Sequence, residues 1–240
     1  MRILYLCWQR LEACPPCMNH LDILKGDSAE VTLVCRSSDH SYMTERYADV
    51  TDFRFFDADF PEDAPSAREL SLLWLREVRA YRAYVREALS EGYDFVWFGT
   101  EDSALLARDL VSIPYVLTCL EFWDEALKKT RFIRSAAKGA ALCIACERTR
   151  AWLMKLEWGL PALPVVIPNK FEDHPRTPQM RGSSEESRRA IAKIEGKQVV
   201  LYQGWLQPDR GLEEIADALS LLDEDLWLAV LSPETSECRD

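Results

Sequence analysis

The sequence predicts an α/β protein with a doubly wound, mostly parallel sheet, followed by one incomplete βαβ unit. Short apolar runs alternate with longer amphipathic stretches along the first 168 residues. Most of these runs are continuous rather than alternating, which is typical of strands that are buried on both faces. Strands that alternate with helices pair in parallel, because each helix returns the chain to the same end of the sheet.

Seven apolar runs predict strands, and the segments between them predict helices. The predicted strands span residues 3–8, 31–35, 53–56, 95–98, 115–118, 142–145 and 165–167. The predicted helices span residues 18–25, 67–91, 101–111, 121–138 and 147–158. Thr100 precedes the third helix as a candidate N-cap, since a threonine hydroxyl can accept a hydrogen bond from a free N–H of the first turn.

The composition changes after residue 168. Residues 169–196 are rich in proline, glycine and serine and contain one charged helix at 185–195, which is typical of a linker. A strand at 198–203, a helix at 210–222 and a strand at 226–231 then form a single βαβ unit. Residues 197–240 hold ten acidic and three basic residues. We therefore expect a domain at 1–168, a linker at 169–196 and the beginning of a second domain at 197–240, because doubly wound sheets are normally built from two halves.

Charge and hydropathy exclude several classes of protein. The net charge of −11 argues against a sequence-independent nucleic-acid binder, which needs an excess of lysine and arginine to neutralise phosphates. The apolar run at residues 3–8 is shorter than the core of a secretion signal, and no stretch reaches the ~20 apolar residues of a membrane span. We expect a cytoplasmic protein.

Eight cysteines include two pairs with C-x-x-C spacing, Cys14 with Cys17 and Cys143 with Cys146. A zinc site would require all four thiolates to converge, and the second pair lies in a predicted strand, where residues three apart point to opposite faces. We therefore predict no metal site. The first pair lies between a strand and a helix, as in thioredoxin-like redox proteins, and the alternative is two loop cysteines beside a Pro-Pro turn.

Three segments together resemble the group 1 family of nucleotide-sugar glycosyltransferases. They are residues 113–118 (IPYVLT), residues 163–169 (LPVVIPN) and residues 199–219, which contain VVLYQG and then RGLEEI with a later AL pair. The order and spacing of all three match the family over essentially the whole chain. The resemblance implies a GT-B fold of two facing Rossmann-like domains. It also implies transfer of a sugar from a nucleotide-diphosphate donor to a glycan or lipid-linked acceptor, with no metal or other cofactor.

The last of these segments has the residue types that a diphosphate site requires. Gly204 lets the backbone approach a phosphate without a Cβ in the way. The helix that follows turns its N-terminal N–H groups toward the same place, and Arg210 adds a planar, permanently charged donor. The alternative is a turn glycine and a surface arginine. The resemblance favours Gly204 and Arg210 as donor-diphosphate residues and Asn169 as part of the turn between the two domains.

The sequence also departs from the family's pattern. Residues 9–13 replace the glycine-rich turn after the first strand, Trp205 replaces an arginine after the donor-domain glycine, and Cys119 to Glu121 hold no histidine. The later part of the donor domain, which would carry the Glu-x7-Glu block that holds the sugar and ribose, is absent from residues 197–240. We therefore expect a C-terminally truncated enzyme with impaired transfer. Alternatives are a non-catalytic acceptor domain that binds a glycan or a partner chain completing the donor domain, and a Cys14/Cys17 thiol oxidoreductase.

Few other residues suggest chemistry. Glu121 follows a predicted strand, at the edge where open α/β sheets bind ligands, and is a candidate acceptor contact, the alternative being a first-turn helix acid. Asp57 and Asp59 have the Asp-x-Asp spacing of a metal-binding motif, but a motif of two residues is too short to assign a metal site. His20, His40 and His174 lack a matching partner, so we assign no catalytic base.

The long helix carries a cationic face. Arg76, Arg79, Arg82 and Arg86 recur at spacings of three and four, opposite an apolar face that includes Tyr81 and Val85. Such a face predicts contact with anionic lipid or with a lipid-diphosphate acceptor. The alternative is a solvated face on which Glu77 and Glu87 pair with the arginines.

Overall fold

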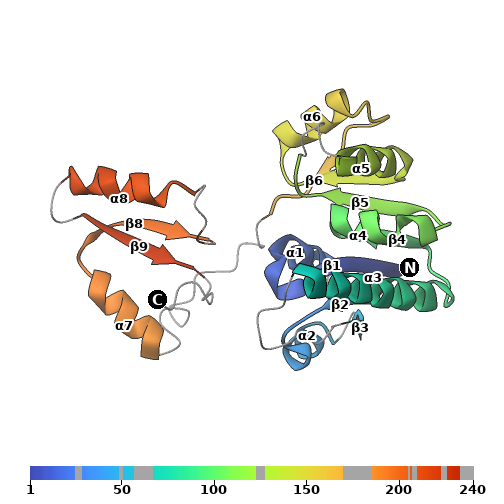
Figure 1. Ribbon diagram of the computed structural model, residues 1–240, viewed down its shortest axis with the longest axis horizontal. Coiled ribbons are helices and arrows are strands. Elements are labelled where there is room, and N and C mark those ends of the chain that lie inside the picture. The colour runs from blue at the N-terminus through green and yellow to red at the C-terminus, as the bar shows by residue number, and fades with distance from the viewer. Residues whose placement is uncertain are drawn as a thin grey trace. The chain divides into compact units, whose positions relative to one another are not determined.

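The computed structural model describes residues 1–24, 29–48, 51–56, 67–122, 128–169, 185–204, 206, 210–222 and 226–232. The chain divides into two compact units, Met1–Glu172 and Asp173–Asp240, which are described separately. Figure 1 shows the elements of both units.

The first unit is built on a seven-stranded sheet in which every pair of neighbours is parallel (Figure 1). The strand order is β3-β2-β1-β4-β5-β6-β7. The strands are β1 (Arg2–Arg10), β2 (Glu30–Arg36), β3 (Thr51–Phe55), β4 (Phe95–Phe98), β5 (Tyr115–Cys119), β6 (Leu142–Ala145) and β7 (Val165–Val166). All seven strands expected from the sequence are present, so the predicted parallel α/β sheet is confirmed.

In the described part of the first unit, six α-helices cover this sheet. They are α1 (Pro15–Leu24), α2 (His40–Arg46), α3 (Ala67–Leu89), α4 (Glu101–Ala107), α5 (Lys128–Gly139) and α6 (Arg148–Glu157), with 3-10 turns at Leu11–Ala13 (η1) and Arg108–Leu110 (η2). Helix α2 was not predicted, and α1 begins earlier than predicted because prolines fit the first turn of a helix. The prediction of a helix starting at Glu121 is wrong: Glu121 and Phe122 lie outside any helix.

The side chains of β1 alternate between two hydrophobic clusters. Leu4, Leu6 and Trp8 pack in the cluster that includes residues of α3, α4, α5 and α6. Ile3, Tyr5 and Cys7 pack in the cluster that includes residues of α1 and α2. The central strand is therefore buried on both faces, which is why its sequence is a continuous apolar run.

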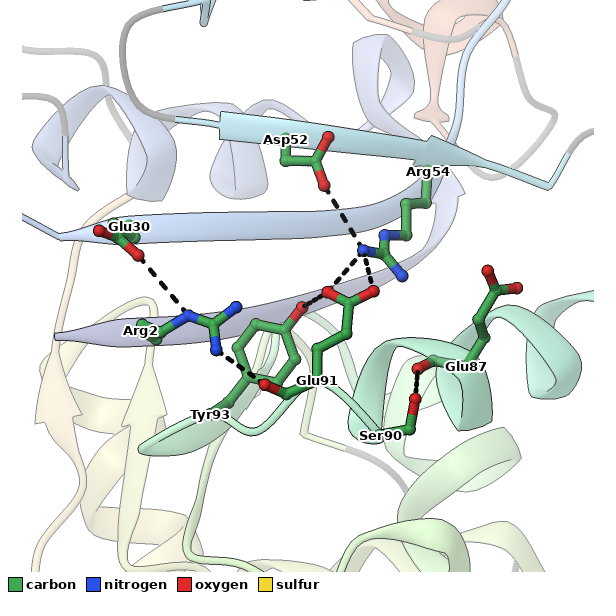
Figure 2. A network of polar contacts seen from close by, with 8 residues as sticks. All are labelled: Arg2, Glu30, Asp52, Arg54, Glu87, Ser90, Glu91 and Tyr93. Atoms are coloured by element: carbon green, nitrogen blue, oxygen red, sulfur yellow. Dashed lines mark hydrogen bonds and ion pairs between the residues drawn. The ribbon is translucent and has the colours of Figure 1, made fainter.

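A polar network joins the turn after α3 to the first three strands (Figure 2). Both carboxylate oxygens of Glu91 accept from Arg54 Nη2, at 2.6 and 2.7 Å, and the Tyr93 hydroxyl donates to Glu91 Oε2 at 3.1 Å. Arg2, the first residue of β1, donates to the Glu91 carbonyl oxygen at 2.8 Å and lies 3.6 Å from Glu30. Arg2 and Glu30 begin their strands, opposite the end where doubly wound sheets bind ligands, so this network is structural.

The second unit contains α7 (Glu185–Ile194) and a parallel β–α–β element formed by β8 (Gln198–Gln203), α8 (Leu212–Ser220) and β9 (Leu226–Leu231). None of the described residues of this unit is buried. Leu201, Leu221 and Leu231 are 62%, 86% and 58% exposed. Two strands and their helices thus leave much apolar surface in water, because the sheet is too small to cover it.

Over the described part of the chain, no helix has both the length and the apolar character needed to cross a membrane.

Candidate functional site

The strand order of the first unit identifies the edge at which a ligand would bind. The connections after β1 lead outward to β2 and β3, and the chain then returns to place β4 on the other side of β1. This reversal between β1 and β4 is a topological switch point, and open α/β sheets bind ligands in the crevice outside the carboxyl ends of the strands there. The residues after β1, β4 and β5 therefore form the first candidate site.

Hydrogen bonds tie the ends of β1 and β4 together. The Trp8 N–H donates to Ser103 Oγ at 2.9 Å, and Ser103 Oγ lies 2.8 Å from Thr100 Oγ1. Thr100 Oγ1 also accepts from the Ser103 N–H at 3.3 Å, so the predicted N-cap is confirmed. Thr100 and Ser103 are both buried, which makes this part of the switch point rigid.

Glu101 is the main ionisable group buried at this edge, with 4% of its surface exposed. Its Oε1 accepts from the Glu121 N–H at 2.7 Å, so the carboxyl of α4 holds the turn that follows β5. Burial raises the pKa of Glu101 to about 7, with a contribution from the nearby charge of Asp102, although backbone N–H donors oppose the shift. Glu101 therefore titrates near neutral pH, and it also positions Glu121, the predicted acceptor contact.

Glu121 itself lies immediately beyond β5, at the carboxyl end, and its side chain is exposed. Glu121 Oε2 is 3.3 Å from Arg150 Nη1, and Arg150 Nε lies 3.8 Å from Glu147 Oε1. Arg150 also donates to the Leu120 carbonyl oxygen. Glu121 is thus available to solvent and ion-paired. Arg150 and Glu101 could not be predicted from the sequence, because each resembles an ordinary helix residue until the fold brings the turns together.

Three buried thiols lie on the other side of β1. Cys7 Sγ is 3.7 Å and Cys14 Sγ is 3.2 Å from Cys17 Sγ, and Cys17 Sγ donates to the Gly99 carbonyl oxygen at 3.5 Å. Hydrogen bonds with Cys17 and Cys7 lower the pKa of Cys14 well below its usual range, and the same contacts and burial raise the pKa of Cys17. Cys14 and Cys17 are 2% and 0% exposed. A thiol oxidoreductase needs an accessible thiolate, so this burial argues against that function.

The second C-x-x-C pair does not join the first. Cys143 Sγ lies 3.9 Å from Cys119 Sγ, and Cys146 Sγ donates to the Leu120 carbonyl oxygen at 3.3 Å. Among the described residues, the one group of three potential metal ligands is Cys7, Cys14 and Cys17. Cys7 was not predicted to join this group, because it lies in a strand and its spacing from Cys14 and Cys17 matches no metal-binding pattern.

The candidate donor residues belong to the second unit. Gly204 follows β8 with φ of +155°, which L side chains rarely adopt, and its N–H donates to the Leu231 carbonyl oxygen at 3.0 Å. Gly211 has φ of +65° and precedes α8, and Arg210 is exposed just before it. Gly204 and Arg210 thus lie at the two ends of the loop between β8 and α8, the positions that the sequence predicts for them.

Asn169 is exposed in the first unit, just beyond β7. The carbonyl oxygen of the preceding Pro168 accepts from Asn19 Nδ2 at 3.2 Å, which ties this turn to α1. Of the histidines, His20 bonds Tyr5 through Nδ1 at 2.8 Å and His40 stacks on Phe55. His174, Trp205, Asp57 and Asp59 lie outside the described residues.

One arginine of the arginine-rich face of α3 makes contacts within the first unit. Both terminal nitrogens of Arg82 donate to Asp109, each at 2.7 Å, and Arg82 Nη1 also donates to the Leu106 carbonyl oxygen. Glu77 is buried and pairs with Arg36 at 2.8 Å, so its predicted pairing with the arginine face is wrong. The other three members of that face, Arg76, Arg79 and Arg86, are exposed.

Comparison with known proteins identifies the fold. No protein-family model matches the chain, and no curated protein matches it by sequence. Among solved structures, Anabaena HepE in complex with UDP and glucose matches with a TM-score of 0.62 and 19% identity, covering 96% of this chain and 60% of HepE. Arabidopsis thaliana UGT89C1 complexed with UDP matches with a TM-score of 0.60 and 12% identity, covering 98% of this chain and 68% of that protein.

Sucrose-phosphate synthase from Thermosynechococcus elongatus matches with a TM-score of 0.59 and 13% identity, covering 99% of this chain and 63% of that enzyme. This chain therefore spans about 60% of the length of HepE and less than two thirds of the synthase. At these identities the likeness concerns the fold. The chain has the α/β fold of the GT-B glycosyltransferases, with a Rossmann-like parallel sheet as its first unit.

Proposed function

We propose that the chain is the acceptor-side domain, a linker and the first part of the donor domain of a glycosyltransferase. The reaction would move a sugar from a nucleotide-diphosphate sugar to a glycan or lipid-linked acceptor in the cytoplasm, with no metal or other cofactor. The observation that carries this proposal is the likeness, over almost the whole chain, to glycosyltransferase structures such as HepE with UDP and glucose. Residues 1–168, 169–196 and 197–240 would be the three parts.

The donor diphosphate is assigned to the loop between β8 and α8. A side chain at position 204 would be strained, because the φ of Gly204 is one that L residues rarely adopt and an added Cβ would lie 3.2 Å from the Tyr202 hydroxyl. Arg210 and the N-terminus of α8 supply the positive charge that a diphosphate needs. Two acidic residues of the first turn, Glu213 and Glu214, weaken that field. Arg210 is therefore the residue on which binding should depend most.

The acceptor is assigned to the carboxyl edge of the first unit's sheet. Glu121 is the exposed carboxylate there and would accept hydrogen bonds from acceptor hydroxyls. Asn169 would belong to the turn between the two domains rather than to the acceptor site. For a lipid-linked acceptor, the exposed Arg76, Arg79 and Arg86 would contact the anionic head group, and Arg82 would contribute less because Asp109 already binds it.

Transfer by these 240 residues should be weak. Residues 197–240 contain no Glu-x7-Glu block of the kind that the family resemblance places around the sugar and ribose. Catalysis requires contacts that are stronger in the transition state than in the ground state, and most of those to the donor would come from that block. An assay of sugar transfer with a panel of nucleotide sugars tests this expectation, and robust turnover would contradict it.

Calorimetric titration with UDP and GDP tests the donor assignment without requiring turnover. Replacing Arg210 by alanine should weaken nucleoside-diphosphate binding ~10- to 100-fold, because a charged hydrogen bond contributes about 1.5–3 kcal/mol. The matched control is Arg188→Ala, which removes an exposed arginine from α7 of the same unit and should leave affinity unchanged. Equal affinities of the Arg210→Ala variant and the wild type would refute the assignment.

A second candidate function is a non-catalytic domain that binds a glycan or a partner chain. The observation in its favour is the exposed apolar surface of the second unit, at Leu201, Leu221 and Leu231. Light scattering during gel filtration tests the partner-binding version. Association that is lost in Leu221→Lys would support it, and a monomer at every concentration would count against it.

A further inference from the structure

A cluster of three thiols lies in the core of the first unit, between β1 and the beginning of α1. Cys7 belongs to β1, Cys14 immediately precedes α1, and Cys17 belongs to the first turn of α1. The three sulfur atoms lie within 4.8 Å of one another. We propose that Cys7, Cys14 and Cys17 form a three-thiolate binding site for Cu(I).

The separations between the sulfur atoms fit one central ion. Thiolate bonds to d10 metal ions are about 2.3 Å long, so sulfurs that share an ion lie roughly 3.8–4.0 Å apart. Cys7 Sγ and Cys17 Sγ are already 3.7 Å apart. Cys14 Sγ and Cys17 Sγ are 3.2 Å apart and would separate by roughly 0.6–0.8 Å, which a small change in side-chain torsion provides. No disulfide joins them.

The number of ligands favours Cu(I) over Zn²⁺. Structural zinc sites are tetrahedral and need four ligands, and no fourth cysteine, histidine or carboxylate of the described chain joins this group. His20 lies on α1 near the cluster, and its Nδ1 is engaged with the Tyr5 hydroxyl at 2.8 Å. Burial of all three cysteines leaves little access for a water ligand. Soft thiolates select Cu(I), which accepts three of them.

The beginning of α1 places a helix N-terminus beside the thiols. The Cys14 carbonyl oxygen accepts from the N–H groups of Cys17 at 2.9 Å and Met18 at 3.3 Å, so Cys14 is the cap of a ten-residue helix. The positive end of that helix dipole lies against the thiols.

Binding is an exchange of protons for metal. Three Cu–S bonds form, the protons still carried by the thiols are released to solvent, and no electron is transferred because copper enters and remains as Cu(I). The ion would join β1 to α1 across η1, beside the Gly99 carbonyl oxygen at the end of β4. Its effect would be to stabilise the switch-point region of the sheet, independently of sugar transfer.

Anaerobic titration of the reduced chain with Cu(I), in competition with a chromophoric Cu(I) chelator, tests the site. We expect one tightly held equivalent and a higher melting temperature with Cu(I). Cys14→Ser should lose at least ~100-fold in affinity and show no thermal shift, since even outer-shell changes cost ~10- to 100-fold. The matched control is Cys146→Ser, from the other C-x-x-C pair, which should bind as the wild type does.

X-ray absorption of the wild-type complex provides a test that does not depend on whether a variant folds. Three sulfur neighbours at a single distance of about 2.3 Å would support the site. Copper lost to the chelator, copper bound through nitrogen or oxygen ligands, or equal binding by Cys14→Ser would overturn it. Preferential retention of Zn²⁺ in tetrahedral geometry would also overturn the three-coordinate assignment.

Discussion

Replacing Glu101 by glutamine should make the stability of the first unit less dependent on pH. Glu101 is 4% exposed, and its pKa is raised to about 7 from an ordinary value of 4.5, chiefly by burial. In the unfolded chain the carboxyl ionises near pH 4.5, whereas in the folded chain it stays protonated until about pH 7. The unfolded state therefore binds fewer protons between these values, and stability falls as the pH rises through that window.

The size of the effect follows from the two pKa values. Each tenfold change in proton affinity corresponds to about 1.4 kcal/mol, so the ionised Glu101 costs the folded state about 3 kcal/mol above pH 7. Glutamine keeps an oxygen that can accept from the Glu121 N–H, at 2.7 Å in the wild type, and it carries no charge. The variant should match the wild type at pH 4.5 and exceed its unfolding free energy by about 3 kcal/mol at pH 8.

Urea unfolding at half-unit pH intervals, compared between wild type and variant, measures this difference. The matched control is Glu157→Gln, which changes an exposed glutamate of α6 and should alter stability by less than about 0.5 kcal/mol at every pH. A difference between Glu101→Gln and wild type that does not change with pH would refute the reasoning. So would a variant less stable than the wild type at pH 8.

Two further substitutions test the packing around the switch point. Glu77→Gln breaks the largely buried ion pair with Arg36 and should lower the free energy of unfolding, measured in urea, by about 3 kcal/mol. The control Glu87→Gln, on the same helix, should change that free energy by less than about 0.5 kcal/mol. Equal effects of the two substitutions would contradict this account. Gly99→Ala would place a Cβ 2.5 Å from the Tyr5 hydroxyl and should lower the free energy of unfolding by about 1–3 kcal/mol. A variant as stable as the wild type would show instead that Tyr5 can move.

Local sequence patterns were sufficient for most of the first unit's secondary structure. The predicted bounds of the strands at 95–98 and 142–145 agree with β4 and β6 because both are short apolar runs bounded by polar or glycine-containing turns. The short helix α2 escaped prediction, since its seven residues carry no long apolar period and depend on the Asp39 cap, which accepts from the Tyr42 N–H. The helix predicted from Glu121 began too early because a backbone contact with Glu101 holds Glu121 in a turn.

The candidate site was less accessible to sequence reasoning. The pattern located Glu121, Gly204 and Arg210 beside strand ends, since ligand edges follow from strand direction alone. The helical spacing assigned Glu77 to the wrong partner, because spacing gives the side of a helix on which a residue lies but not which distant residue it meets. The structure pairs Glu77 with Arg36 on β2. The spacing also left Arg82 on a cationic face that Asp109, 27 residues later in the chain, partly neutralises.

The sequence by itself determined the alternation of strands and helices, their parallel pairing and the change of character after residue 168, because each of these is written in local periodicity and composition. Tertiary structure alone decided which distant residues meet. It placed the carboxyl of Glu101 under the turn that carries Glu121, and it added Cys7 to the Cys14 and Cys17 pair. Those groups acquire their chemistry from burial and from neighbours across the sheet, and neither is recorded in the spacing of residues along the chain.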